Sequence, residues 1–73
     1  MTLNQLRPSQ TATVTAVRGE GALRLRLLDM GVLPGTSITL IKTAPLGDPM
    51  EFTLRDYTLT LRAADAAMVE VEQ

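Results

Sequence analysis

Apolar and polar side chains alternate along five short stretches of this chain, and such alternation is typical of β-strands with one buried face. The stretches are residues 11–17, 36–43, 50–55, 57–62 and 68–72. The last but one is the most regular: Tyr57, Leu59 and Leu61 are expected to face inward and the residues between them outward. Turn-forming segments separate most of the stretches, which predicts antiparallel strands.

The alternation also predicts which side chains form the core. In residues 11–17, Ala12, Val14 and Ala16 are expected on one face and Val17 on the other. The remaining strand positions expected to face inward are Ile38, Leu40, Phe52, Leu54, Val69 and Val71. Leu3 and Leu6, in the segment that precedes the first strand, are expected to pack against the body of the domain.

A short helix is expected between residues 22 and 30. Leucine and arginine alternate at its start, as in a strand, but leucine, arginine and methionine favour helices and no β-branched residue occurs here. Gly31 fits the left-handed residue that ends a helix, which would bring Val32 onto Leu27 in a Schellman cap. Pro34 and Gly35 then predict a tight turn.

The expected helix has two apolar stripes. One consists of Leu23, Leu27 and Met30. The other, on roughly the opposite face, consists of Leu25 and Leu28, with Arg24 beside it. A helix on a small domain normally buries one stripe, so Leu25, Leu28 and Arg24 are candidate partner-binding residues; the alternative is that the second stripe also packs in the core.

The loop APLGDP, residues 44–49, is a second candidate surface. Its two prolines restrict the chain and would hold Leu46 outward as a rigid apolar tip. Leu46, Gly47, Asp48 and Pro49 are therefore candidate partner-binding residues, although the loop could simply be a stiff connection and Asp48 could cap a turn. At the next turn, Asp56 is expected to take the left-handed conformation.

The fold class expected from these elements is mainly β. Seventy-three residues allow one domain, residues 1–73. Five short strands, one helix and a helical turn at residues 63–67 suit a small, strongly bent antiparallel barrel. Closure of such a barrel is expected to hide the sheet edges.

Composition excludes several kinds of chemistry. The chain has no cysteine and no histidine, which removes disulfides, zinc-finger ligands and the usual general base of catalysis. The glycines fit no phosphate-binding spacing, so neither an enzyme nor a cofactor is expected. Five acids (Glu51, Asp56, Asp65, Glu70 and Glu72) match no metal-ligand template.

Charge and hydropathy limit the partners. The net charge is −1 and no basic block occurs, which argues against nucleic acid and against a membrane-surface helix. No apolar run is long enough to span a bilayer, and the first ten residues do not read as a secretory signal, so a cytoplasmic location is expected. Spare apolar surface is also compatible with weak self-association.

The chain resembles the FeoA family of ferrous iron transport proteins. The resemblance rests on LLDMGVLPG at residues 27–35, APLGDP at residues 44–49 and LTLRAADAAMVEV at residues 59–71. It implies an SH3-like barrel and a cytoplasmic accessory of a FeoB-type ferrous iron permease, which carries a G-protein domain. Many members have glycine in the turn before the fourth strand, where this chain has Arg55 and Asp56.

Three functions follow as hypotheses. The first is an adaptor that contacts the FeoB-type permease and modulates transport, either activating or inhibiting. The second is a metal-responsive regulatory module, because similar barrels end the iron-dependent repressors. The third is capture of proline-rich peptides, which needs an aromatic groove; it is disfavoured because the two aromatic residues, Phe52 and Tyr57, are both expected in the core.

Overall fold

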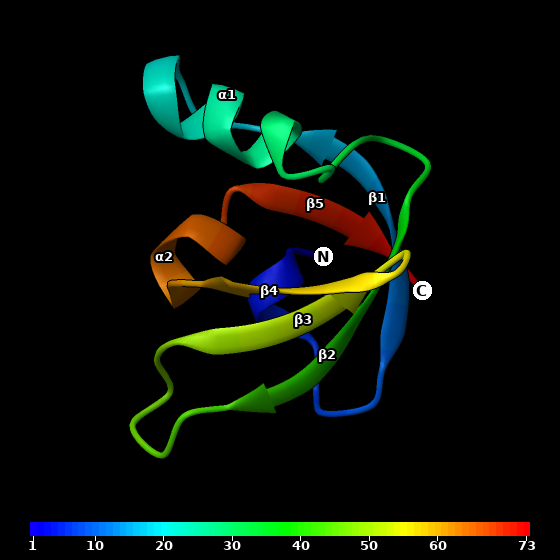
Figure 1. Ribbon diagram of the computed structural model, residues 1–73, viewed down its shortest axis with the longest axis vertical. Helices are drawn as coiled ribbons and strands as arrows, with labels where there is room; N and C mark the ends of the chain where they lie inside the picture. The colour runs from blue at the N-terminus through cyan, green and yellow to red at the C-terminus, as the bar shows by residue number, and fades with distance from the viewer.

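The computed structural model describes residues 1–73, and its elements follow the predicted order (Figure 1). They are η1 (Leu3–Gln5), β1 (Thr11–Val17), α1 (Gly21–Asp29), β2 (Ser37–Thr43), β3 (Met50–Leu54), β4 (Tyr57–Leu61), α2 (Ala63–Ala66) and β5 (Val69–Glu72). All five predicted strands, the helix and the later helical turn are present. The expectation of a mainly-β domain with one inserted helix is therefore confirmed.

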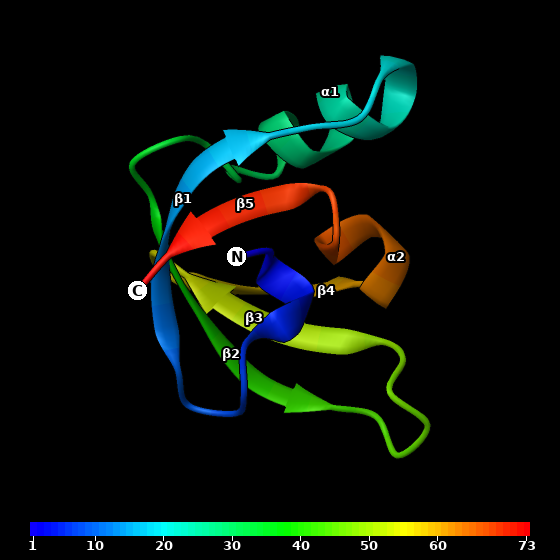
Figure 2. The ribbon, with the colours of Figure 1, turned by 180° about the vertical axis from the view of Figure 1, so that it is seen from behind.

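The five strands form one antiparallel sheet in the order β4-β3-β2-β1-β5. The sheet curls around the core, with α2 connecting β4 to β5 and η1 beside β5 (Figures 1 and 2). The outer edge of β5 is covered by the N-terminus, because the Val71 N–H donates to the Met1 carbonyl at 2.8 Å and Thr2 bridges to Glu70. No strand covers β4, so the expectation that both edges are hidden is wrong for β4.

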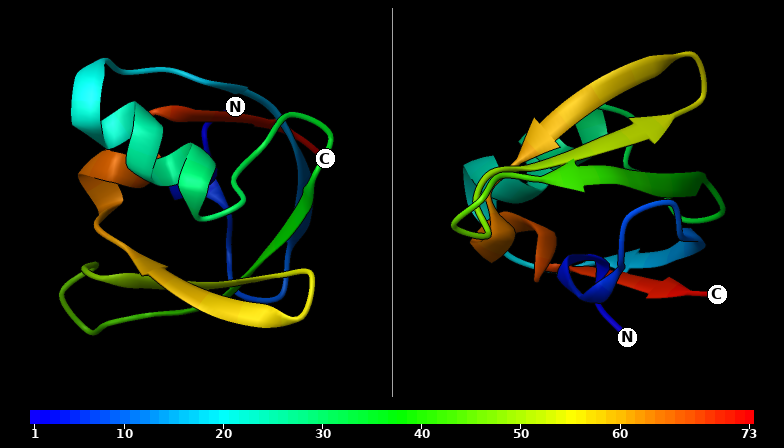
Figure 3. Two further views of the ribbon diagram at one scale, coloured as in Figure 1. Left: turned by 45° about the horizontal axis from the view of Figure 1, so that its top comes forward. Right: turned by 90° about the horizontal axis from the view of Figure 1, so that it is seen from below.

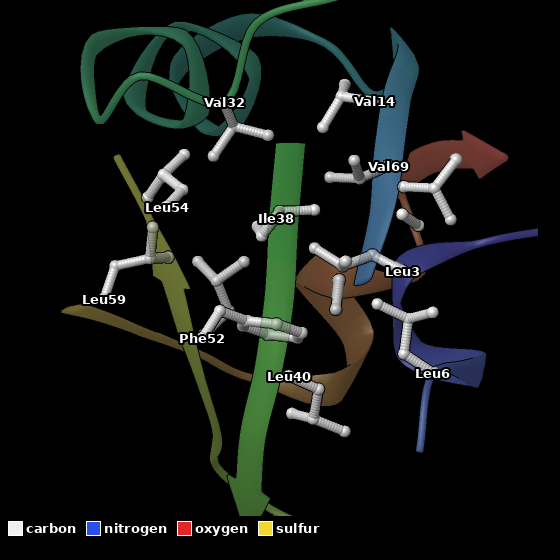
Figure 4. Close-up of a cluster of buried hydrophobic side chains, with 14 of the residues drawn as sticks. Leu3, Leu6, Val14, Val32, Ile38, Leu40, Phe52, Leu54, Leu59 and Val69 are labelled. Carbon is white, nitrogen blue, oxygen red and sulfur yellow. The ribbon is translucent and has the colours of Figure 1, made fainter. Parts of the chain in front are cut away.

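Seventeen buried apolar residues form a single core. All the inward positions predicted for the second, third and fifth strands are among them, and so are Leu3 and Leu6 (Figure 4). Phe52, at the middle of β3, is completely buried and is the largest of these side chains. The N-terminal segment is therefore part of the core and not an appendage.

The predicted faces of β1 are wrong at its end. Its pairing with β5 shifts register between Val14 and Ala16, which marks a bulge. A bulge adds a residue to one strand, so the side chains beyond it change face. Val17 is consequently buried together with Ala12 and Val14, and Ala16 is only half-buried, whereas the alternation placed Ala16 on the face of Ala12 and Val14 and Val17 on the other face.

Two predictions at the turn between β3 and β4 are also wrong. Tyr57 is 42% exposed: it stands at the start of β4 with its hydroxyl beside Gly31, while Leu54 opposite it fills the core. Arg55, with φ of 53°, takes the left-handed conformation that was expected of Asp56. Both turn types that suit a two-residue hairpin, I′ and II′, require positive φ at the first turn residue. Arg55 is that residue.

The end of α1 is as predicted. The N–H of Val32 donates to the Leu27 carbonyl and that of Gly31 to the Leu28 carbonyl, each at 3.0 Å. These are the two bonds of a Schellman motif, and Gly31 has the positive φ, 92°, that it needs. The Pro34-Gly35 turn follows, and the Gly35 N–H donates to the Val14 carbonyl at 2.7 Å, which joins the turn to β1. Gly31, Pro34 and Gly35 thus position α1 on the barrel.

Candidate docking surface

The loop between β2 and β3, residues 44–49, is closed by main-chain hydrogen bonds. The N–H of Ala44 donates to the Pro49 carbonyl at 3.0 Å, and that of Gly47 to the Ala44 carbonyl at 2.8 Å. The Asp48–Pro49 peptide bond is cis and Gly47 has φ of 90°. The two main-chain hydrogen bonds hold Leu46 at the tip with 98% of its surface exposed, as the sequence predicted.

Asp48 has a structural partner. Its Oδ1 accepts a hydrogen bond of 2.7 Å from the N–H of Ala63, the first residue of α2. The first N–H groups of a helix lack partners within the helix, and side-chain oxygens of serine, threonine, asparagine or aspartate commonly accept from them. Asp48 therefore caps α2 from a distant loop. Of the two roles considered for Asp48, partner contact or cap, the structure shows the cap.

A second polar contact continues from α2 to α1. Asp65 of α2 lies 4.0 Å from an Arg26 guanidinium nitrogen on α1. The loop, α2 and α1 consequently follow one another along one side of the molecule, the left side in Figure 1 and the right side in Figure 2. We call residues 44–49, α2 and α1 together the helical side. Leu46 and the helix α1 lie at its opposite ends.

The apolar stripes of α1 are placed unequally. Leu27 is completely buried, and Leu23, Leu28 and Met30 are half-buried against the core. The predicted second stripe is therefore divided: Leu28 packs inward, whereas Leu25 is 60% exposed. Leu25 remains a candidate contact residue, and Leu28 serves mainly to seat the helix.

Arg24 is occupied within the chain. Its Nε donates to the carbonyl of Val17, the last residue of β1, at 3.2 Å. The guanidinium thus satisfies a carbonyl at a strand end and fixes α1 against β1. This contact could not be predicted from local patterns, because the bulge in β1 sets the position of Val17.

The carboxylates do not form a metal-binding cluster: no three aspartate or glutamate side chains come together. Glu70 lies 3.9 Å from Arg18 Nε, and Asp65 is beside Arg26. Beside the loop is an open hollow of about 340 Å³, which sequence reasoning did not anticipate. It is lined by Lys42, Thr43, Ala44, Pro45, Pro49, Glu51 and Thr60.

Neither aromatic residue builds a groove for proline-rich peptides. Phe52 is completely buried, and Tyr57 is the one aromatic ring at the surface. A peptide groove of that kind needs several aromatic walls. Neither helix of the protein has the length and apolar character required to cross a membrane.

These features define a small β-barrel domain with exposed leucines at a loop tip and on a helix. The FeoA domain model matches residues 1–73. The chain therefore belongs to the FeoA domain family.

Relatives agree with this assignment. The chain is 42% identical over 72 residues to the Fe(2+) transport protein A/Fe(2+) transporter FeoB fusion protein of Porphyromonas gingivalis, covering 99% of this chain and 8% of that protein. It superposes on iron(II) transport protein A of Clostridium thermocellum with a TM-score of 0.93 at 36% identity, covering 99% of this chain and 44% of that one.

A third relative identifies the barrel type. The structure of Stenotrophomonas maltophilia FeoA complexed with zinc, described as a prokaryotic SH3 domain protein, matches with a TM-score of 0.88 at 26% identity. The match covers 99% of this chain and 89% of that one. The SH3-like fold implied by the sequence motifs is thus confirmed.

Proposed function

We propose that this protein docks on the cytoplasmic part of a FeoB-type Fe2+ permease and modulates transport by contact. The fusion relative supports the pairing, since it carries both proteins in one chain. Covalent joining of two domains gives them a high effective concentration, which favours a mutual contact. The proposal places the protein in the cytoplasm, at the inner face of the membrane when bound.

The observation that carries the docking surface is the exposure of Leu46. A leucine that is 98% exposed stabilises nothing within its own chain. Main-chain hydrogen bonds and the Asp48 contact with Ala63 hold the loop in place, so little conformational entropy is lost when a partner covers the tip. Gly47 and Pro49 contribute by fixing this geometry.

The helical side extends the surface toward α1. Leu25 provides a second exposed apolar residue at the other end, and the contacts from Asp48 to α2 and from Asp65 to Arg26 link the two ends. A partner that covers both leucines gains two apolar anchors on one face. Burial of each exposed leucine at an interface is favourable because it removes apolar surface from water.

The test is the affinity of the purified protein for the cytoplasmic domain of the FeoB-type permease from the same organism. Leu46→Glu and Leu25→Glu are each expected to weaken binding by about tenfold or more, since a charge then replaces a buried apolar contact. Leu33→Glu is the matched control, because Leu33 is an exposed leucine outside the helical side, in the turn between α1 and β2.

Thermal unfolding of each variant separates a lost contact from lost folding. Parental affinity in both Leu46→Glu and Leu25→Glu would refute the helical side as the docking surface. Absence of any binding by the parent protein would refute the direct contact itself. A loss of affinity in Leu33→Glu alone would move the surface to the turn between α1 and β2.

A further inference from the structure

Strand β4 is the one sheet edge that no other segment covers. In the right-hand view of Figure 3 it is the outermost strand, beyond β3. Leu54 and Tyr57 flank a two-residue turn, where the two opposed residues hydrogen-bond each other. From this pair on, hydrogen-bonded and non-hydrogen-bonded pairs alternate along β3 and β4. The main-chain groups of Thr58 and Thr60 therefore point away from β3, and neither N–H has a partner elsewhere in the chain.

The edge also lacks the features that normally block pairing. Residues 57–61 contain no charged side chain and no proline. The register between β3 and β4 runs without a shift, whereas the β1–β5 and β2–β3 pairs both contain one. Charges, prolines and bulges are the usual protection of an exposed edge, so β4 is open to another strand.

A row of threonines leads to this edge on the outer face of the sheet. Thr11 pairs with Thr39, Thr39 with Thr53, and Thr53 with Thr58. The hydroxyls of Thr11 and Thr39 are 2.7 Å apart. Opposed threonines stabilise neighbouring strands, and the row stops at Thr58 only because no further strand is present.

We propose that two copies of this chain pair antiparallel through β4, about a two-fold axis at Leu59. In that register Thr58 of each copy stands opposite Thr60 of the other. Both residues have outward N–H and C=O groups, so the pairing forms four main-chain hydrogen bonds. The strand is thus complementary to itself, as a two-fold interface requires.

Charges beyond the strand favour a second copy over a strand from another protein. The same register sets Asp56 of one copy against Arg62 of the other, on both sides of the axis. Neither residue has an ion pair within its own chain, where the two pairs are Arg18–Glu70 and Arg26–Asp65. Arg62 has extended backbone, with φ of −70° and ψ of 148°, and so continues the line of β4.

The interface is small, since the strand has five residues. A dimer of this kind is expected to be weak, with a dissociation constant on the order of 100 μM. Sedimentation equilibrium between about 10 μM and about 1 mM covers that range. Amide hydrogen exchange by NMR over the same range shows whether Thr58 and Thr60 become protected as concentration rises.

Charge reversal tests the register. Asp56→Arg and Arg62→Asp are each expected to raise the dissociation constant about tenfold, because like charges then face each other twice. The double variant Asp56→Arg/Arg62→Asp restores opposite charges and is expected to return the constant to within about threefold of the parent. Glu72→Arg is the control, an equal change of charge at an exposed position of β5.

A second variant addresses the main chain. Thr60→Pro removes an outward N–H that β3 does not use, so it is expected to abolish the dimer and leave the fold intact. A protein that stays monomeric over the whole range would overturn the proposal, as would a dimer indifferent to all these variants. Protection of Thr58 and Thr60 only after addition of the permease domain would also overturn it and assign the edge to that partner.

Discussion

Gly31 satisfies two separate demands at one position. It ends α1 with φ of 92°, a conformation that costs an ordinary residue about 1–2 kcal/mol. A Cβ at this position would also lie 2.8 Å from the Tyr57 hydroxyl oxygen. The helix end and the start of β4 therefore meet at a point where only hydrogen atoms fit without adjustment.

Gly31→Ala is accordingly expected to lower the free energy of unfolding by about 1–2 kcal/mol, measured by urea denaturation. Most of this loss belongs to the backbone, because the Tyr57 hydroxyl is at the end of a side chain that can shift. The same substitution in a Tyr57→Phe background isolates the backbone share. A parental unfolding free energy in Gly31→Ala would contradict both demands.

At the scale of elements, Asp48 connects the β2–β3 loop to α2. Asp48→Ala leaves the Ala63 N–H without its acceptor and is expected to cost about 1 kcal/mol of stability. Asp48→Asn keeps a side-chain oxygen and is expected to cost less than the alanine variant. Urea denaturation of the two variants, with amide exchange at Ala63, is the measurement.

Equal losses in the two Asp48 variants would show that the carboxylate charge, and not the hydrogen bond, holds the loop. Unchanged exchange at Ala63 in Asp48→Ala would contradict the cap itself. Either result would also weaken the case for a rigid Leu46, because the tip is held partly through this contact.

The strands and the end of α1 could be predicted because their signals are local. Alternation identifies a strand with one buried face, and Gly31 followed by Val32 specifies the helix cap. Val17 could not be placed, since a bulge depends on pairing with β5, which lies far along the chain. Tyr57 was wrongly predicted to be buried, because alternation shows which face a residue is on but not where along its length the strand leaves the core.

The candidate surface was predictable only in part. Exposure of Leu46 follows from its place in a loop bounded by Pro45 and Pro49. The choice between Leu25 and Leu28 depends on how α1 rotates against the barrel, and that is set by tertiary contacts such as Arg24 with the Val17 carbonyl. The link between Asp48 and Ala63 likewise joins residues that only the folded chain brings together.

At the scale of the whole molecule, the first six residues complete the domain. Leu3 is completely buried and Leu6 nearly so, and Met1 and Thr2 pair with the edge of β5. A domain of 73 residues without a disulfide has little stability in reserve. Part of its core therefore depends on residues 1–6, whose only regular element is the short helix η1.

Leu3→Ala is expected to cost about 2–5 kcal/mol, as for other leucines truncated in a packed core. The free energy of unfolding of a whole domain is only about 5–15 kcal/mol, so this loss is a large share of it. The variant is therefore expected to unfold at a far lower urea concentration than the parent. Arg7→Ala, at an exposed position in the same segment, is the control and is expected to change stability by at most about 0.5 kcal/mol. If Leu3→Ala proved as stable as Arg7→Ala, the N-terminal turn would unfold independently. The β5 edge would then open with it, and β4 would no longer be the one uncovered edge of the sheet.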